Sequence, residues 1–135
     1  VNFNSRCSQL EAKILVAYEE GTTLEQAERL AAEFLYAQLQ VSSELPKFDL
    51  DARMRKTGIK AVKAAIYMDA ATKDPKKPTE AMLSAIVDQN EVVQSEQNSF
   101  DTAEVKKAEL ERLYDVFLNA HIYFRGLAKN GMANG

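Results

Sequence analysis

The chain has few of the residues on which several protein classes depend. Its 135 residues include one cysteine, no tryptophan, three prolines and five glycines. A single cysteine, Cys7, excludes an internal disulfide and favours a reducing compartment. No apolar run approaches the roughly 18 residues of a membrane span, and the N-terminus lacks the basic-then-apolar pattern of a signal peptide. We therefore expect a cytoplasmic protein with no membrane partner.

Glycine and proline are too widely spaced for the frequent turns of an all-β protein. The long segments between them carry apolar residues every three or four positions, which predicts an all-α fold. With 46% hydrophobic residues, a chain of this length can bury one modest core. We expect a single helical domain over residues 1–129 and a flexible tail over residues 130–135.

Two short helices are predicted near the N-terminus. The first covers about residues 8–20 and stops at Gly21. The second ends before Pro46, because proline lacks the N–H donor that a helix interior needs. Between them, a threonine followed three residues later by Glu or Gln predicts a capping box. The residues concerned are Thr22, Thr23, Glu25 and Gln26.

A basic middle helix is predicted next. Asp49 or Asp51 can cap its start, and the loop at residues 72–78, which contains two prolines, ends it. Thr79 follows that loop and can cap another helix. The middle helix is the part of the chain in which candidate binding residues gather.

The segment 79–125 contains no glycine or proline, and its 47 residues would extend about 70 Å as one helix. Either the segment folds back at the polar residues 98–102, or partner chains cover it. Its second half carries an apolar stripe, predicted to be a seam within one chain or between the chains of a homo-oligomer. The stripe comprises Leu110, Leu113, Phe117, Ala120, Phe124 and Leu127, and the predicted oligomer seam is Leu110, Leu113, Phe117 and Phe124.

Positive charge is concentrated in one segment. Residues 53–77 hold eight of the 17 Lys and Arg residues and two of the 20 Asp and Glu residues, so this segment is near +6 although the whole chain has a net charge of -3. On a helical wheel, five of its side chains fall within an arc of roughly 80°. These side chains, which we call the basic row, are Arg53, Lys56, Lys60, Lys63 and Tyr67.

The basic row has two interpretations. Spaced cations displace counterions from a nucleic-acid backbone, and Tyr67 could stack on an exposed base. Lys76 and Lys77 in the following loop would extend this track. Alternatively, the row is only solvated, or it pairs with acidic side chains of the first two helices. Those acids are Glu19, Glu20, Glu25, Glu28 and Glu33.

Patterns for catalysis and metal binding are absent from the sequence. His121 is the only histidine, and no second histidine or cysteine accompanies it as a metal ligand. We find no Gly-rich phosphate loop and no nucleophile elbow. We therefore expect a protein that is not an enzyme and needs neither a metal nor a cofactor.

The order of these motifs resembles a known family. Lys60, Lys63 and Tyr67 form a Lys-x-x-Lys-x-x-x-Tyr pattern before a lysine-rich turn, and Val-Gln-Ser-Glu at residues 93–96 precedes a closing apolar helix that ends in Arg-Gly at residues 125–126. This order is similar to the UvsY-type recombination mediators of tailed phages over roughly residues 25–129. The acidic composition and the first helix depart from the family pattern.

The resemblance implies a small helical protein that assembles into rings, binds single-stranded DNA and helps to load a recombinase onto strands coated by single-strand-binding protein. Lys60 and Lys63 would match the family's DNA-contacting segment, and the C-terminal helix its assembly region. Our leading hypothesis is accordingly an oligomeric accessory protein of phage recombination or replication, located in the host cytoplasm.

Two alternatives from other classes remain open. The chain could be a phage virion or assembly protein, such as a head-to-tail connector or a scaffolding component, whose basic face docks on an acidic protein surface. It could also be an inhibitor that binds a host protein. Both alternatives predict protein contacts without affinity for nucleic acid.

Overall fold

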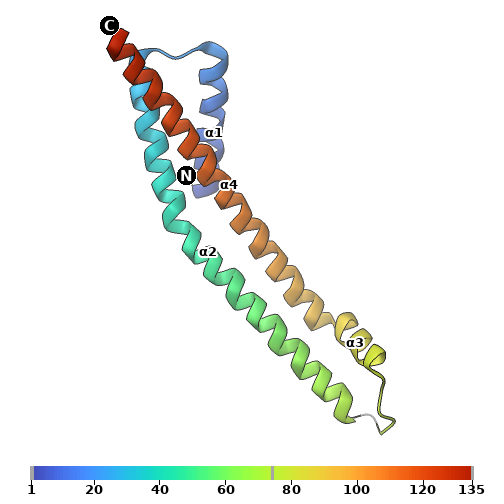
Figure 1. The fold of residues 1–135 in the computed structure, drawn as a ribbon. Coiled ribbons are helices and arrows are strands. Elements are labelled where there is room, and N and C mark those ends of the chain that lie inside the picture. The colour runs from blue at the N-terminus through green and yellow to red at the C-terminus, as the bar shows by residue number, and fades with distance from the viewer. Residues whose placement is uncertain (1, 74, 135) are drawn as a thin grey trace. The chain divides into compact units, whose positions relative to one another are not determined.

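The computed structural model describes residues 2–73 and 75–134, and only the backbone of residues 132–134. Over these residues it has four helices and no strand, which confirms the all-α prediction (Figure 1). The helices are α1 (Phe3–Glu20), α2 (Leu24–Lys73), α3 (Glu80–Gln89) and α4 (Glu91–Asn134). No described helix combines the length and the apolar character that a bilayer span requires.

The boundary between α1 and α2 follows the predicted cap residues. Helix α1 ends at Glu20 and is followed by Gly21, whose φ of 78° is easily adopted only by glycine. The Thr23 N–H donates to Oε1 of Gln26 at 3.0 Å, and the Gln26 N–H donates to Oγ1 of Thr23 at 3.2 Å, which is the reciprocal capping box. Helix α1 begins earlier than predicted because Asn2 caps it, accepting from the Ser5 N–H at 2.8 Å.

Helix α2 continues through Pro46, so the predicted helix end before this residue is wrong. The apolar spacing explains the continuity, since Val41 and Ala52 are buried on either side of the proline and lie on one helical stripe. Asp49 and Asp51 do not start a new helix. They form ion pairs one turn later instead, with Arg53 at 2.9 Å and Arg55 at 3.1 Å.

The helical segment is interrupted at Asn90, and the alternative of a fold-back at residues 98–102 is wrong. Asn90 has an extended backbone, and its Oδ1 accepts from the Val92 and Val93 N–H groups at 2.9 and 3.3 Å, so it caps α4. Polar side chains at the predicted break bond within the helix, where Thr102 Oγ1 donates to the Asn98 carbonyl oxygen at 2.9 Å. Helix α3 begins as predicted, because Thr79 accepts from the Met82 N–H.

The backbone of residues 130–134, where we expect a flexible tail, continues helix α4 in the structure. Close approach to α2 explains the glycine in this turn. A Cβ atom at Gly131 would lie 2.8 Å from Cδ1 of Leu24. Gly135 lies outside the described residues.

The chain groups into two compact units. The first comprises residues 1–45 and 109–135, and the second comprises residues 46–108. Helices α2 and α4 contribute to both units, α1 only to the first and α3 only to the second. The basic row lies entirely in the second unit.

Three phenylalanines form the centre of the first unit. Phe34 of α2 and Phe117 of α4 are both 0% exposed, and their ring centroids are 5.8 Å apart. Phe124 stacks on Phe34 at 5.7 Å. The apolar stripe of α4 is therefore a seam within one chain, and the expectation that it lines an oligomer seam is corrected. The four residues of that expectation, all buried here, are Leu110, Leu113, Phe117 and Phe124.

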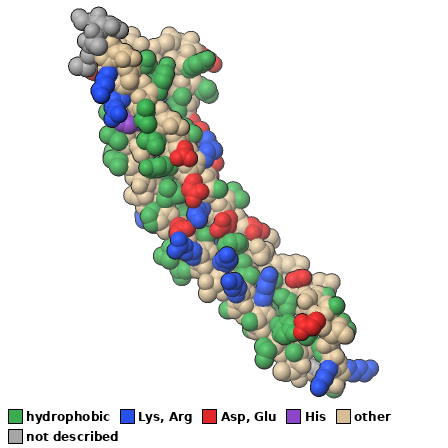
Figure 2. All heavy atoms as spheres, viewed as in Figure 1, with side chains coloured by type: hydrophobic (Ala, Val, Ile, Leu, Met, Phe, Trp, Pro, Cys, Tyr) green, Lys and Arg blue, Asp and Glu red, His purple; other side chains and the backbone are tan. Residues whose placement is uncertain are grey.

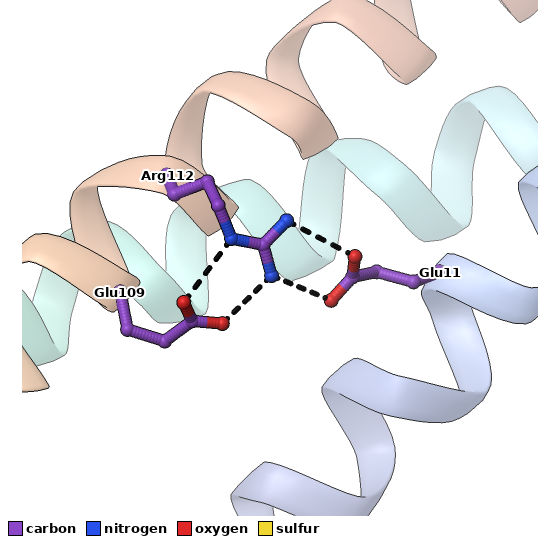
Figure 3. A network of polar contacts seen from close by, with 3 residues as sticks. All are labelled: Glu11, Glu109 and Arg112. Atoms are coloured by element: carbon purple, nitrogen blue, oxygen red, sulfur yellow. Dashed lines mark hydrogen bonds and ion pairs between the residues drawn. The ribbon is translucent and has the colours of Figure 1, made fainter.

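An arginine between two carboxylates joins α1 to α4 in the first unit (Figure 3). Arg112 makes two hydrogen bonds to Glu11, at 3.2 and 3.1 Å, and two to Glu109, at 3.1 and 2.7 Å. The hydrogen bonds from Glu109 and then from Glu11 raise the pKa of Arg112 above its ordinary value. Four of the five N–H donors of this guanidinium are thus engaged within the first unit, and they tie α1 to α4.

The second unit has a core of smaller side chains. Its buried members come from three helices and are Ala52 and Ile59 of α2, Leu83 and Val87 of α3, and Val93 and Ala103 of α4. Ile59 fixes the orientation of the middle of α2, because Lys56, three positions before it, and Lys60, one position after it, lie about 60° and 100° away around the helix. This orientation exposes Lys56 and Lys60.

Candidate nucleic-acid interface

The lysines of the basic row lie open on α2. Lys56 and Lys60 are exposed and Lys63 is half-buried. None of the three has a carboxylate of the described residues within 4.0 Å. Several Lys and Arg side chains appear over this part of the molecule in Figure 2, with hydrophobic side chains among them. The row therefore presents cations to solvent.

The alternative for the basic row was that it pairs with acids of the first two helices. The described lysines of the row form no such pairs. Two of those acids have other partners within the first unit. Glu33 binds Lys13 at 2.7 Å, and Glu25 binds Arg29 at 3.3 Å. The charges of Lys56, Lys60 and Lys63 stay available to an external anion.

Arg53, at the start of the row, is partly neutralised. Its Nη2 lies 2.9 Å from Oδ2 of Asp49, and Lys107 of α4 lies 2.9 Å from the other oxygen of the same carboxylate. The hydrogen bond from Lys107, assisted by the charges of Arg53 and Lys107, holds the pKa of Asp49 below its ordinary value. Asp49 is thus anionic at neutral pH and weakens the positive field at this end.

Tyr67, at the other end of the row, is fixed by α3. Its hydroxyl donates to Oε1 of Glu80 at 2.7 Å, and this hydrogen bond raises the pKa of Tyr67 above its ordinary value. The ring is half-buried. It therefore has a defined position, which favours a stacking role over a freely rotating side chain.

Two open grooves adjoin the row where α2 meets the other helices of the second unit. One has a volume of about 340 Å³ and is lined by Lys63, Ala64, Tyr67, Ser84, Val87 and Asp88. The other has a volume of about 360 Å³ and is lined by Lys63, Asp88, Val93, Gln94, Gln97 and Asn98. Lys63 and Asp88 line both grooves without forming an ion pair.

Sequence reasoning missed the α3 and α4 residues of these grooves. Ser84 and Asp88 carry no local signal. The expected fold-back at residues 98–102 drew no attention to Gln94 and Gln97, and only the packed structure places these two residues beside Lys63. Amide and hydroxyl side chains can bond to base edges or to a peptide backbone.

The predicted loop cations are exposed between α2 and α3. Lys76 has an interaction within the chain, so it is not a free cation. Lys77 is exposed, and Lys73 at the end of α2 binds Asp69 at 2.9 Å. The free part of the row is therefore its centre, from Lys56 to Lys63.

His121 serves the packing of the first unit. Its Nδ1 lies 2.9 Å from the carbonyl oxygen of Ala31, to which it donates. Among the described residues, no group of three His, Cys, Asp or Glu side chains is placed to hold a metal ion.

Comparisons with protein-family models, with curated proteins and with solved structures find no match for this chain.

Proposed function

We propose that the protein binds single-stranded DNA along the basic row and acts by positioning the strand, without catalysis or a cofactor. The observation that carries this proposal is the set of three lysines, Lys56, Lys60 and Lys63, on one face of α2 that form no ion pair with a carboxylate of the described residues. Cations spaced along a helix bind phosphates and release counterions.

The adjoining grooves favour a single strand over a duplex. Lys63 and Tyr67 line one groove together, so a phosphate on the lysine brings the attached nucleoside near an aromatic ring. Base stacking on aromatic side chains is typical of proteins that bind single strands without sequence preference. Unpaired bases can enter such grooves, whereas paired bases cannot.

Oligomerisation completes the proposal. Three lysines give weak binding alone, and linking several copies raises the avidity without new contacts. In this role the protein would act in the host cytoplasm as an accessory of phage recombination or replication, with a recombinase and single-strand-binding protein as partners. These partners come from the resemblance to the UvsY-type mediators.

The test is fluorescence anisotropy with a labelled 30-nucleotide oligo(dT) at several salt concentrations. We expect salt-sensitive binding, and we expect the double variant Lys60→Ala/Lys63→Ala to bind roughly tenfold more weakly at low salt, with a slope of log K against log salt that is smaller by about 1.4. The matched control is Arg125→Ala/Lys129→Ala, which removes two exposed cations of α4 in the first unit.

The proposal would be contradicted by equal losses of oligo(dT) affinity in the two double variants, or by no binding of oligo(dT) by the wild type at low salt. Light scattering on the same samples tests the oligomer. A wild type that fails to bind DNA but co-purifies with phage particles would favour the virion-assembly alternative.

A further inference from the structure

Helix α2 carries a second stripe, apolar except for Thr57, which faces solvent. Six residues at successive spacings of four, three, four, three and four are all exposed, and the three largest, Leu50, Met54 and Met68, are 58%, 65% and 60% exposed. Single exposed apolar residues are common, but a heptad spacing kept over 19 residues is the pattern of a helix–helix seam. We call these residues the outer strip: Leu50, Met54, Thr57, Ala61, Ala64 and Met68.

The outer strip lies opposite the side of α2 that packs in the second unit. On a helical wheel its members fall roughly 140° to 220° from the buried Ile59. The buried residues of α2 in this unit, Ala52 and Ile59, pack with α3 and α4 in one core. Since the core already uses the Ile59 face, no packing requirement of this unit explains the outer strip.

The centre of the outer strip is hollowed. A shallow groove of about 430 Å³ is lined by Arg53, Met54, Thr57, Gly58 and Ala61. Nothing lies within 4 Å of a Cβ atom placed on Gly58, so the groove is open at its floor. Small residues such as Gly58 and Ala61 let another helix approach the groove closely. Leu50 and Met68 would contact that helix at the two ends of the strip.

Cations border one edge of the outer strip, and they indicate the chemistry of its partner. Lys56 and Lys60 follow this edge together with Arg53, which is paired with Asp49, and no acidic residue occurs between residues 52 and 68. At the other edge, Asp51 and Asp69 are already paired with Arg55 and Lys73. The complementary surface is therefore apolar with an acidic border.

We propose that the outer strip docks an amphipathic helix of another protein, whose apolar stripe is bordered by Asp or Glu. The strip extends 18 residue steps, about 27 Å, and so matches a partner helix of roughly five turns. The inference does not depend on DNA binding, because its apolar contacts lie outside the basic row.

Charge argues against an antiparallel second copy of the same strip as the occupant. Packed helices lie about 8–10 Å apart, so two strips facing each other in antiparallel orientation would bring their two rows of cations within about one Debye length at 0.1 M salt. An acidic helix at the same place removes this repulsion. Lys56 and Lys60 would then be shared between the acidic helix and a DNA strand, and we expect the two ligands to compete.

The probe is a dye-labelled synthetic peptide of 21 residues that forms a helix with Leu and Ala on one face and Glu on both borders. The control peptide carries Lys in place of every Glu. We expect the acidic peptide to bind at least tenfold more tightly. Ala61→Glu, at the centre of the strip, should weaken binding of the acidic peptide tenfold or more, whereas Ala85→Glu, on the exposed side of α3, should change it less than twofold.

A second variant separates the apolar contact from charge. Met54→Gln keeps the charge of the protein. It should weaken binding of the acidic peptide several-fold and leave the affinity for oligo(dT) within twofold of the wild type. Circular dichroism of each variant checks that the helices persist. Equal binding of both peptides, or unchanged binding by Ala61→Glu and Met54→Gln, overturns the proposal. A wild-type dimer that Ala61→Glu dissociates also overturns it, since a second copy would then cover the strip.

Discussion

Tyr67 shows how a contact outside its own helix changes the chemistry of a single side chain. Its hydroxyl reaches Glu80 across the loop between α2 and α3, and the ring borders a groove beside Lys63. Since a hydrogen bond to a carboxylate favours the protonated phenol, the pKa of Tyr67 is raised in the folded state. The stabilisation from this contact is complete below the unfolded pKa, near 10, and is lost as the pH rises through the folded pKa.

Tyr67→Phe should therefore destabilise the protein slightly at pH 7, because it removes the hydrogen bond and keeps the ring. The difference from the wild type should shrink as the pH rises above 10 and through the raised folded pKa of Tyr67. Urea unfolding at pH 7, 9 and 11, followed by circular dichroism, measures this. A variant as stable as the wild type at pH 7 would show that the contact contributes nothing. The same variant should keep its affinity for oligo(dT) if the ring acts by stacking.

Helix α2 shows how packing outweighs a local signal at the scale of an element. An interior proline removes one backbone hydrogen bond and disfavours the helix by about 3 kcal/mol. The apolar stripe that includes Val41 and Ala52 continues across Pro46, and burial of those side chains offsets the penalty. The position of Pro46 at the boundary of the two compact units agrees with this, because each unit packs its own part of the helix.

Pro46→Ala should raise the free energy of unfolding by roughly 1–3 kcal/mol, since it restores the N–H donor, while a more flexible unfolded chain takes back part of the gain. The matched control is Pro78→Ala, in the loop before the cap residue Thr79, which should give no gain. Denaturant titration gives both values. If Pro46→Ala is no more stable than the wild type, the proline fits the helix without cost.

The two units bury different kinds of core at the scale of the whole molecule. In the first, Phe117 and Phe124 both pack on Phe34, whereas the second relies on alanine, valine, leucine and isoleucine. Large buried rings contribute more per residue than these small side chains. We therefore infer that a buried residue contributes more stability in the first unit than in the second, and that the unit with the basic row is the less stable one.

Phe34→Ala should lower the free energy of unfolding by about 3–5 kcal/mol, because it leaves a cavity between Phe117 and Phe124. Its neighbour Leu35 is 41% exposed, so Leu35→Ala should cost well under half as much. Chemical unfolding of the two variants provides the comparison. Similar losses at the two positions would mean that Phe34 is not the centre of the core.

Local rules were sufficient for the fold class, the capping box at Thr23, the stop at Gly21 and the start after Thr79. These features depend on hydrogen bonds that span three or four residues, so nearby residue types determine them. The same holds for the alignment of the basic row, because helical periodicity alone places its members on one face.

Only the tertiary structure decided which of the apolar stripes is buried, and where the helices end. The stripe of α4 packs on Phe34 of the same chain, the break falls at Asn90, and Tyr67 finds Glu80. Each of these outcomes depends on residues far apart in the sequence or on the balance between burial and a local penalty. Apolar spacing shows which face of a helix is stabilised by burial, and packing determines which other helix buries it.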